Sequence, residues 1–384
     1  MINKKVAVLG STGSVGTQVL DICDRLGADV VYIAAHSNVK LLEEQIRRFS
    51  PKICAATDEK SAAALKTAVS DTNTKIVSGY DNMCSSVAET DCDIVYNAVS
   101  GKNGLMPTLS VLQSGKTLAL ANKESMVLAG DIVNRTASEH NAMILPVDSE
   151  HCAIFQCLFH GSGNEVKRIL LTASGGPFFG YTREMLEKVT LADTLKHPTW
   201  NMGRKITVDS ATLANKGLEI IEAMHLFHVS HDKIKVLVHR QSIVHSMVEF
   251  IDNSVIAQLS VPDMRHPGQF ALTYPERCCG VIDELDLTRK PLTFEEPDTD
   301  AFPMLRLARY CASKGGILPC AYNAANEAAV DLFLRQKIRF NDIYKITEYT
   351  LSQIQNIMSP DLTQILECDK ICRDIAYSYE EKHL

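Results

Sequence analysis

The chain has 384 residues, of which 46% are hydrophobic and 22% charged, and its formal net charge is −7. This length allows two or three domains with a large core, and the acidic balance argues against nucleic-acid binding as the main function. No run approaches the roughly 18 apolar residues of a membrane span, and the N-terminus resembles neither a signal nor a transit peptide. We therefore expect a cytoplasmic protein that does not bind membranes and whose twelve cysteines are reduced.

The first part of the chain alternates apolar runs with helical patterns. Expected strands lie at Lys5–Leu9, Asp29–Ala35, Ile53–Ala56, Lys75–Val77, Asp93–Ala98, Thr117–Ala121 and Met143–Val147. Helical patterns run to Leu26 after the first strand and over Lys60–Val69 and Leu105–Gln113. Strands and helices in strict turn are typical of a parallel, doubly wound sheet, so we predict an α/β, Rossmann-like domain over residues 1–147.

After Asp148 the pattern changes. A helix is expected at Ala153–Leu158, a loop entering a helix at Val208–Phe227, and strands at Arg168–Thr172, Lys235–His239, Ser242–Phe250 and Ser254–Val261. The last two strands are joined by Asp252-Asn253, which favours antiparallel pairing. We predict a central α+β domain (148–282), a Pro-rich charged linker (283–303) and a C-terminal helical domain (304–384).

A glycine-rich turn follows the first strand and opens a helix, with Gly10, Gly13 and Gly16 three residues apart. Glycines permit a tight turn and let backbone N–H groups approach a pyrophosphate at a helix N-terminus. The alternative is a glycine-rich turn of some other α/β protein. The βαβ context favours dinucleotide binding.

The end of the second strand indicates which dinucleotide is bound. NAD sites usually carry an acid there, whereas this chain has His36, Ser37 and Asn38. A carboxylate would repel a 2′-phosphate, so its absence favours NADP, although the same residues could form an ordinary polar loop.

Asp148 and Glu150 follow the expected strand Met143–Val147. Side chains two apart on extended chain point the same way, so both carboxylates should project from the strand's carboxyl end. A divalent ion would keep both ionised, and oxygen ligands favour Mg²⁺ or Mn²⁺. The alternative is a solvated loop in which Asp148 or Ser149 caps a helix starting near His151.

Further polar groups occur at two other places. Lys123 follows the strand Thr117–Ala121 and could orient substrate oxygens, or it could simply be solvated. Ser210, Asn215 and Lys216 are expected around a helix start, where they suit a phosphate. Glu219 lies four residues after Asn215, so it could be a third ion ligand, or Ser210 and Asn215 could be caps and Glu219 a first-turn acid.

Two loops complete the predicted site. Ser174 lies in a glycine-rich turn suited to an anion, and His197 lies in a polar loop that also holds Trp200, the only tryptophan. Trp200 could be a packing anchor or part of a lid that excludes water, and His197 by itself is more often structural than catalytic.

Seven blocks occur in order: GSTGSVG, LALANKES, PVDSEH, LLTASGGPF, HPTWNMGRK, VDSATLANKGLE and PDMRHP. With them the chain resembles the 1-deoxy-D-xylulose 5-phosphate reductoisomerase family from Lys5 to the C-terminus. The resemblance implies rearrangement of that sugar phosphate and its reduction by NADPH to 2-C-methyl-D-erythritol 4-phosphate, in non-mevalonate isoprenoid biosynthesis. It also implies Mg²⁺, Mn²⁺ or Co²⁺, a homodimer and inhibition by fosmidomycin.

The resemblance also implies residue roles. Metal ligands would be Asp148, Glu150 and Glu219, which with Lys123 form the catalytic set. Substrate contacts would include Lys123, Glu150 and Glu219, together with Ser149, Ser174, His197, Trp200, Ser210, Asn215 and Lys216. The cofactor side would comprise Thr12, Gly13, Ser14, Val15, His36, Ser37, Asn38, Asn122, Glu124, Gly203 and Met264. Many members carry Gly-Lys-Asn where this chain has His36-Ser37-Asn38, so one lysine cation is missing here.

The predicted metal ligands agree with this activity. A hydroxyketone chelated to a divalent ion is polarised as by a Lewis acid, and the carbonyl that the rearrangement produces can accept hydride. Two other hypotheses remain. One is a metal-free dehydrogenase acting on a hydroxy or amino acid, with Lys123 as proton donor. The other is a non-enzymatic dinucleotide sensor, for which clustered carboxylates and a phosphate site have no obvious use.

Overall fold

The computed structural model describes residues 2–158, 165–200, 202–288 and 291–383, and only the backbone of 380–383. Met1, 159–164, Asn201, residues 289–290 of the predicted linker and Leu384 lie outside the described residues. The chain forms two compact units. The first comprises Met1–Ser125, Val133–Cys152 and Asp263–Asp283, and the second comprises Met126–Ile132, Ala153–Pro262 and Glu284–Leu384. Each unit is described by itself.

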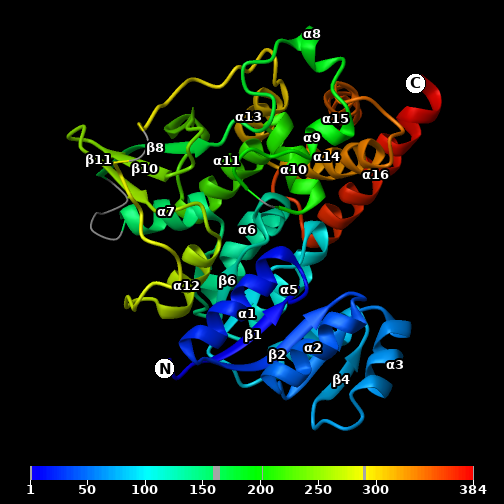
Figure 1. Ribbon diagram of the computed structural model, residues 1–384. Coiled ribbons are helices and arrows are strands. Elements are labelled where there is room, and N and C mark those ends of the chain that lie inside the picture. The colour runs from blue at the N-terminus through cyan, green and yellow to red at the C-terminus, as the bar shows by residue number, and fades with distance from the viewer. Residues whose placement is uncertain (1, 159–164, 201, 289–290, 384) are drawn as a thin grey trace. The chain divides into compact units, whose positions relative to one another are not determined.

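The first unit is built on a parallel sheet of seven strands in the order β4-β3-β2-β1-β5-β6-β7 (Figure 1). The strands are β1 (Lys5–Leu9), β2 (Asp29–Ala35), β3 (Ile53–Ala56), β4 (Lys75–Ser78), β5 (Ile94–Asn97), β6 (Thr117–Leu120) and β7 (Ile144–Pro146). Their side chains are mostly buried, except on the edge strand β4, as expected for a sheet with helices on both faces. The predicted doubly wound sheet is confirmed, with strand ends within one or two residues of expectation.

The helices of this unit include α1 (Ser14–Leu26), α2 (Val39–Phe49), α3 (Glu59–Ala68), α4 (Tyr80–Glu89), the short η1 (Gly101–Gly104), α5 (Leu105–Gln113) and α12 (Arg265–Thr273). Helix α6 (Lys123–Glu139), kinked at Ala129, and α7 (Ser149–Cys157) contribute residues to both units. The sequence patterns did not locate α2, α4, α6 or α12.

Helix α12 packs on α1 although more than 200 residues separate them in the chain. A Cβ on Gly268 would lie 2.8 Å from Ile22 Cδ1, so glycine allows the close approach. Tyr96 donates to the Gly268 carbonyl at 2.8 Å, and Arg265 Nη1 lies 3.3 Å from Asp21 Oδ2. These contacts place Met264, immediately before α12, in the same unit as the glycine-rich turn.

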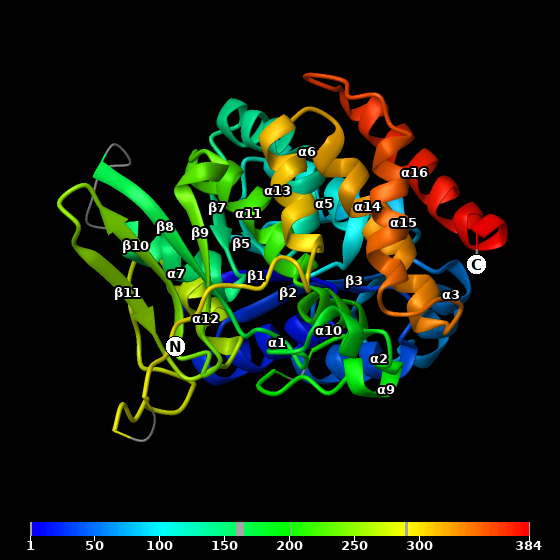
Figure 2. The ribbon, with the colours of Figure 1, turned by 90° about the horizontal axis from the view of Figure 1, so that it is seen from above.

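The second unit contains a four-stranded sheet in the order β11-β10-β8-β9 (Figure 2). Its strands are β8 (Val166–Ala173), β9 (Ile234–Val238), β10 (Val244–Phe250) and β11 (Val255–Leu259). Strands β10 and β11 pair antiparallel, which confirms the prediction for the segments around Asp252-Asn253.

The helices of the second unit are mostly C-terminal. They are α8 (Arg183–Leu186), α9 (Leu191–Thr194), α10 (Arg204–Thr212), α11 (Ala214–Phe227), η4 (His231–Lys233), α13 (Met304–Lys314), α14 (Leu318–Leu334), α15 (Asp342–Ser352) and α16 (Leu362–His383). Helix α14 is almost wholly buried and lies beside α15 and α16 in both views (Figures 1 and 2). None of the described helices is long and apolar enough to cross a membrane.

The expectation of a single helix in Val208–Phe227, entered from a loop, was wrong. Helix α10 already begins at Arg204, and α11 begins at Ala214. Leu213 separates them with φ 60° and ψ 12°, a left-handed conformation that no glycine marks in the sequence. Ser210 therefore lies in the last turn of α10, and only Asn215 and Lys216 lie at a helix start.

Candidate active site

The glycine-rich turn follows β1, at the point where the strand order of the parallel sheet reverses. A Cβ on Gly10 (φ +79°) would lie 2.4 Å from the Ala98 carbonyl oxygen, and one on Gly16 would lie 2.1 Å from the Gly10 oxygen. Both positions therefore require glycine. Gly13 precedes α1, and with it Thr12, Ser14 and Val15 are at least partly exposed. The turn presents backbone N–H groups at a helix N-terminus, as a pyrophosphate site needs.

Gln45 supports this turn and was not singled out from the sequence. Its side chain is buried, accepts from Ser11 Oγ at 2.7 Å and donates to the Ser11 carbonyl at 2.9 Å. One side chain thereby fixes the turn from α2. A glutamine within the apolar stripe of Leu42 and Ile46 was the available signal, because a polar group on a buried helix face needs a partner.

The loop after β2 carries the three residues predicted to meet the cofactor. His36 Nδ1 lies 2.8 Å from Thr57 Oγ1, and the ring is exposed. Asn38 caps α2 by accepting from the Leu41 N–H at 3.2 Å. Ser37 is exposed and its carbonyl accepts from Val39 N. The three side chains lie on one exposed loop at the carboxyl end of β2.

Asn122 is buried and its side chain is engaged within the protein. It donates to the carbonyls of Val99 at 2.6 Å and Gly101 at 2.9 Å, and to Glu124 at 3.2 Å. It accepts from the Ser125 N–H at 2.9 Å, so it caps α6. A Cβ on Gly104 would lie 2.2 Å from this amide. The amide therefore holds the β5 loop against the start of α6.

Lys123 and Asp148 form an ion pair whose side chains are 7% and 12% exposed. The pairing follows from the sheet, because β6 and β7 are neighbours in register and each residue follows its strand by a few positions. This confirms the expectation that both lie on one sheet edge. The pair is a largely desolvated contact, where Coulomb attraction is strong.

The geometric reason given for pairing Asp148 with Glu150 was wrong. Helix α7 begins at Ser149, so Glu150 lies in its first turn and not on extended chain. The Cys152 N–H donates to the Asp148 carbonyl at 2.9 Å, which starts the helix. Ser149 Oγ donates to Glu150 Oε2. A strand-to-helix turn lies between the two residues, but their carboxylate oxygens still lie within 4.8 Å of each other, as expected. Glu150 lies at the positive end of a helix dipole.

In the second unit, Asn215, Lys216 and Glu219 form a bonded cluster at the start of α11. Asn215 Nδ2 donates to Glu219 Oε1 at 2.6 Å, and Lys216 Nζ donates to Glu219 Oε2 at 2.5 Å. Lys216 is 3% exposed and Glu219 is fully buried. The predicted i, i+4 relation of Asn215 and Glu219 is confirmed. A fully buried carboxylate contributes little to stability even when a cation and an amide donate to it. Such groups occur more often at functional sites than in purely structural helices.

Ser174, His197 and Ser210 meet although they come from the turn after β8, a loop and α10. His197 Nε2 lies 3.0 Å from Ser174 Oγ and 3.2 Å from Ser210 Oγ. Ser174 Oγ also accepts from the Gly176 N–H at 3.3 Å. Two hydroxyls and an imidazole nitrogen therefore converge, which suits the oxygens of a phosphate.

His197 is held in its neutral form. Its Nδ1 accepts from the N–H groups of Trp200 at 2.9 Å and Thr199 at 3.2 Å, so the ring proton is on Nε2. Burial, aided by the nearby Arg240 cation, lowers the pKa of His197 to about 4. His197 Nε2 can thus donate towards an oxyanion without carrying a charge.

We expect the stability contribution of the neutral His197 ring to be lost in acid. Its pKa in the folded protein is about 4, below the ordinary value of 6.5, so the unfolded chain binds the extra proton between these values. The thermal midpoint of the wild type should therefore fall towards that of His197→Gln as the pH drops from 6.5 to 4. A gap between the two midpoints that stays constant over this range would contradict the assignment.

Trp200 and Gly203 both precede α10. The Trp200 ring lies 6.1 Å from the ring of His245, whose Nε2 is 2.8 Å from Ser260 Oγ. Gly203 precedes α10 as its N-terminal cap residue, and a Cβ there would meet nothing within 4 Å. Trp200 is therefore partly buried against the second sheet.

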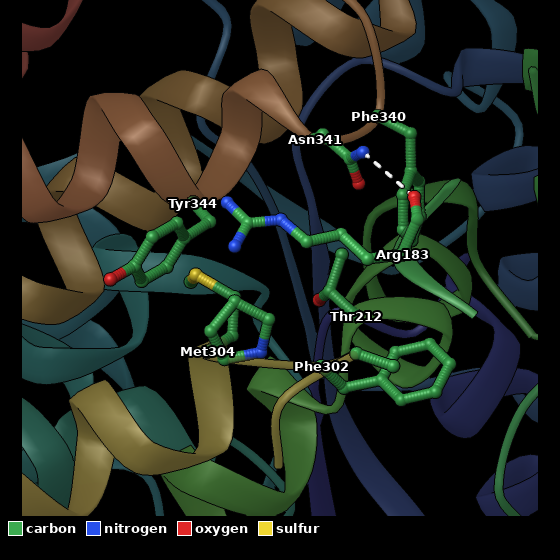
Figure 3. Close-up of a pocket in the computed structure, with 9 residues that line it drawn as sticks. Arg183, Thr212, Phe302, Met304, Phe340, Asn341 and Tyr344 are labelled. Carbon is green, nitrogen blue, oxygen red and sulfur yellow. Dashed lines mark hydrogen bonds between the residues drawn. The ribbon is translucent and has the colours of Figure 1, made fainter. Parts of the chain in front are cut away.

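A small pocket lies elsewhere in the second unit (Figure 3). Phe302 and Met304 line one side, and Arg183 extends its guanidinium towards Tyr344 on the other. Thr212 is the only lining residue from α10. No residue predicted for the site lines this pocket, so it plays no part in the assignment.

The two units therefore carry different functional groups. The first has a glycine-rich turn on a doubly wound sheet and acidic oxygen donors paired with a lysine. The second has a hydroxyl–imidazole cluster and a buried Asn–Lys–Glu cluster. These features define a two-part nucleotide-dependent enzyme of the α/β class whose substrate carries an anionic group.

The comparisons with known proteins give the family. Models of the 1-deoxy-D-xylulose 5-phosphate reductoisomerase match residues 6–130, and models of its C-terminal domains match residues 144–227 and 259–375. The chain belongs to this family. The reductoisomerase of Agathobacter rectalis is 47% identical over 99% of both chains, and that of Acetivibrio thermocellus is 48% identical over 98% of both.

Solved structures of reductoisomerases resemble the chain over nearly its whole length. A reductoisomerase from Zymomonas mobilis in complex with NADPH is 40% identical, with a TM-score of 0.92 over 99% of this chain and 100% of that one. Another, in complex with NADPH, fosmidomycin and magnesium, is 38% identical, with a TM-score of 0.92 over 98% of both chains. The predicted family is thereby confirmed.

Proposed function

We propose that the chain converts 1-deoxy-D-xylulose 5-phosphate to 2-C-methyl-D-erythritol 4-phosphate with NADPH and a divalent metal, in isoprenoid precursor synthesis. Family membership over nearly the whole chain is the observation that carries this proposal. A cytoplasmic location is part of this proposal, because the reaction belongs to small-molecule metabolism.

NADPH is proposed to lie on the first unit. Thr12, Gly13, Ser14 and Val15 receive the pyrophosphate on backbone N–H groups, and the exposed His36-Ser37-Asn38 loop receives the 2′-phosphate. Asn122 acts by shaping the loop after β5, and Glu124 is proposed for the cofactor side of this unit. Gly203, which belongs to the second unit, is proposed as a further cofactor contact. Met264 packs near the nicotinamide from the start of α12.

Asp148, Glu150 and Glu219 are the proposed metal ligands. All three offer carboxylate oxygens without sulfur or imidazole, the donor set that Mg²⁺ and Mn²⁺ prefer. In the chain as described, Lys123 neutralises Asp148 and Lys216 neutralises Glu219. When the cation binds, the two ammonium groups are proposed to turn to substrate oxygens.

The chain's own residues orient the substrate. Ser174, His197, Ser210, Asn215 and Lys216 bind its phosphate, which supplies binding energy remote from the reacting carbons. Lys123 and Ser149 position the ketone and hydroxyl oxygens, and Trp200 excludes water. When bound, the divalent ion polarises the hydroxyketone and NADPH supplies the hydride.

Adding EDTA is the experiment that tests this function. Oxidation of NADPH by the deoxyxylulose phosphate should fall to background and return with Mg²⁺ or Mn²⁺, while NADPH binding persists. A metal-free dehydrogenase using Lys123 would keep its turnover in EDTA. Binding of NADPH without oxidation by any sugar phosphate would instead revive the sensor hypothesis.

A homodimer formed through the second sheet is also proposed. One sheet face carries a cluster of buried apolar residues, Leu170, Val244 and Met247, with partly buried Leu237, Ala257 and Leu259 packed against it. Strand β11 forms the edge of this sheet, with Val255 50% exposed. An apolar sheet face ending in an exposed edge strand is a typical surface for a second copy.

Ala257→Arg should dissociate this dimer, because the substitution places a charge on the apolar sheet face. Ile256 points to the opposite face of the same strand, so Ile256→Arg is the matched control and should stay dimeric. Sedimentation velocity distinguishes the two. A dimer that survives Ala257→Arg would exclude this face.

A further inference from the structure

The C-terminal helices bear none of the residues assigned above, yet they are connected to α10 by buried polar groups. Asp209 is 1% exposed and lies beside Ser210 in the chain. Its Oδ1 accepts from Asn326 Nδ2 of α14 at 2.8 Å, and Asn326 is fully buried. Its Oδ2 lies 2.9 Å from Lys205 Nζ, one turn earlier on α10.

The contact continues as a ladder of alternating charge across three helices. Lys205 Nζ lies 3.9 Å from Glu327 Oε1 of α14, and Glu327 Oε2 accepts from Arg373 Nη2 of α16 at 2.6 Å. Arg373 also donates to Asp369 at 2.8 and 2.9 Å, and this carboxylate helps to raise the pKa of Arg373 against the effect of burial. Each acid of the ladder contacts a cation, which is the arrangement that makes buried charge tolerable.

Such a ladder is a poor source of stability, because desolvation offsets most of the Coulomb attraction. Apolar contacts would hold α10 on α14 at least as well, but they would permit sliding. Directional bonds specify one position of α10 along α14. That position also sets Ser210, since the helix backbone joins it to Asp209 directly.

We propose that Asp209 and Asn326 are positioning residues that hold α10 in the register at which Ser210 and His197 bind the substrate's phosphate. This inference rests on the proposed function. According to this inference, the C-terminal helices affect substrate affinity through α10 and do not contact the atoms that react.

Asn326→Ala tests the proposal, with Asn323→Ala as matched control. Asn323 is also a fully buried asparagine of α14, but its amide donates to Glu327 of the same helix at 3.2 Å and not to α10. Both variants should lower the thermal midpoint. Only Asn326→Ala should raise KM for the sugar phosphate, by about tenfold, with kcat nearly unchanged, as misplacement of a binding group predicts.

A second test exchanges the two residues of the Asp209–Asn326 pair, and it applies even if Asn326→Ala does not fold. Asn326→Asp sets two carboxylates against each other, and adding Asp209→Asn restores a donor and an acceptor. KM should rise in the single variant and recover in the double. Equal KM values for Asn326→Ala and Asn323→Ala, or no recovery in the double variant, would overturn the inference. Absence of turnover in the wild type would instead remove the proposed function, and affinity for inorganic phosphate would then replace KM.

Discussion

Glu150→Gln is expected to abolish turnover while leaving NADPH affinity within about twofold of the wild type. Glutamine keeps the size of the side chain and can still accept from Ser149 Oγ, so α7 should form as before. It lacks the charge that a divalent ion requires. Loss of several kcal/mol of transition-state stabilisation corresponds to a rate decrease of about a thousandfold or more.

Steady-state NADPH oxidation and a separate fluorescence titration of NADPH measure the two quantities. Glu89→Gln, at an exposed glutamate of α4 in the same unit, serves as control and should match the wild type in both. If Glu150→Gln weakened NADPH binding as much as it slowed turnover, Glu150 would belong to the cofactor side and not to the metal.

Lys216→Ala is expected to raise KM for the sugar phosphate by about a hundredfold, the effect of losing a charge-assisted contact to phosphate. The substitution also removes the ammonium that donates to the fully buried Glu219. Breaking a buried ion pair costs about 3–5 kcal/mol, so the thermal midpoint should fall as well. Saturating Mg²⁺ should recover part of the lost stability, since a cation would again neutralise Glu219.

Kinetics over a range of substrate concentrations and thermal melts with and without Mg²⁺ test both parts. Lys196→Ala is the control, because Lys196 adjoins His197 in the chain but its side chain is 75% exposed. An unchanged KM in Lys216→Ala would exclude the lysine from the phosphate site. A melt that Mg²⁺ does not shift would argue against Glu219 as a ligand.

The parallel sheet was predictable because its strands are continuous apolar runs separated by helical patterns. Strand β2 was located to the residue at Asp29–Ala35. The cluster around Asn215 and Glu219 was equally accessible, since a spacing of four puts both on one helix face. Helix α2 was not predicted although its sequence is amphipathic, with Leu42 and Ile46 on the buried face.

The turn at Asp148–Ser149–Glu150 could not be read from spacing alone. An alternating strand and a helix start place the second carboxylate differently, and only the cap contacts of α7 decide between them. Ser210 was assigned to a helix start because the break between α10 and α11 falls at a leucine. The meeting of Ser174, His197 and Ser210 depends on long-range packing, for which no local pattern exists; the family resemblance alone grouped them.

The break between α10 and α11 falls at Leu213, whose conformation sets the angle between the two helices. The left-handed region costs a residue with a Cβ about 1–2 kcal/mol, so the packing around the buried Leu213 must hold it in this conformation. The angle between α10 and α11 therefore depends on the packing around one leucine. Because Ser210 and Lys216 lie three residues to either side of it, that packing sets the position of one proposed phosphate contact relative to the other.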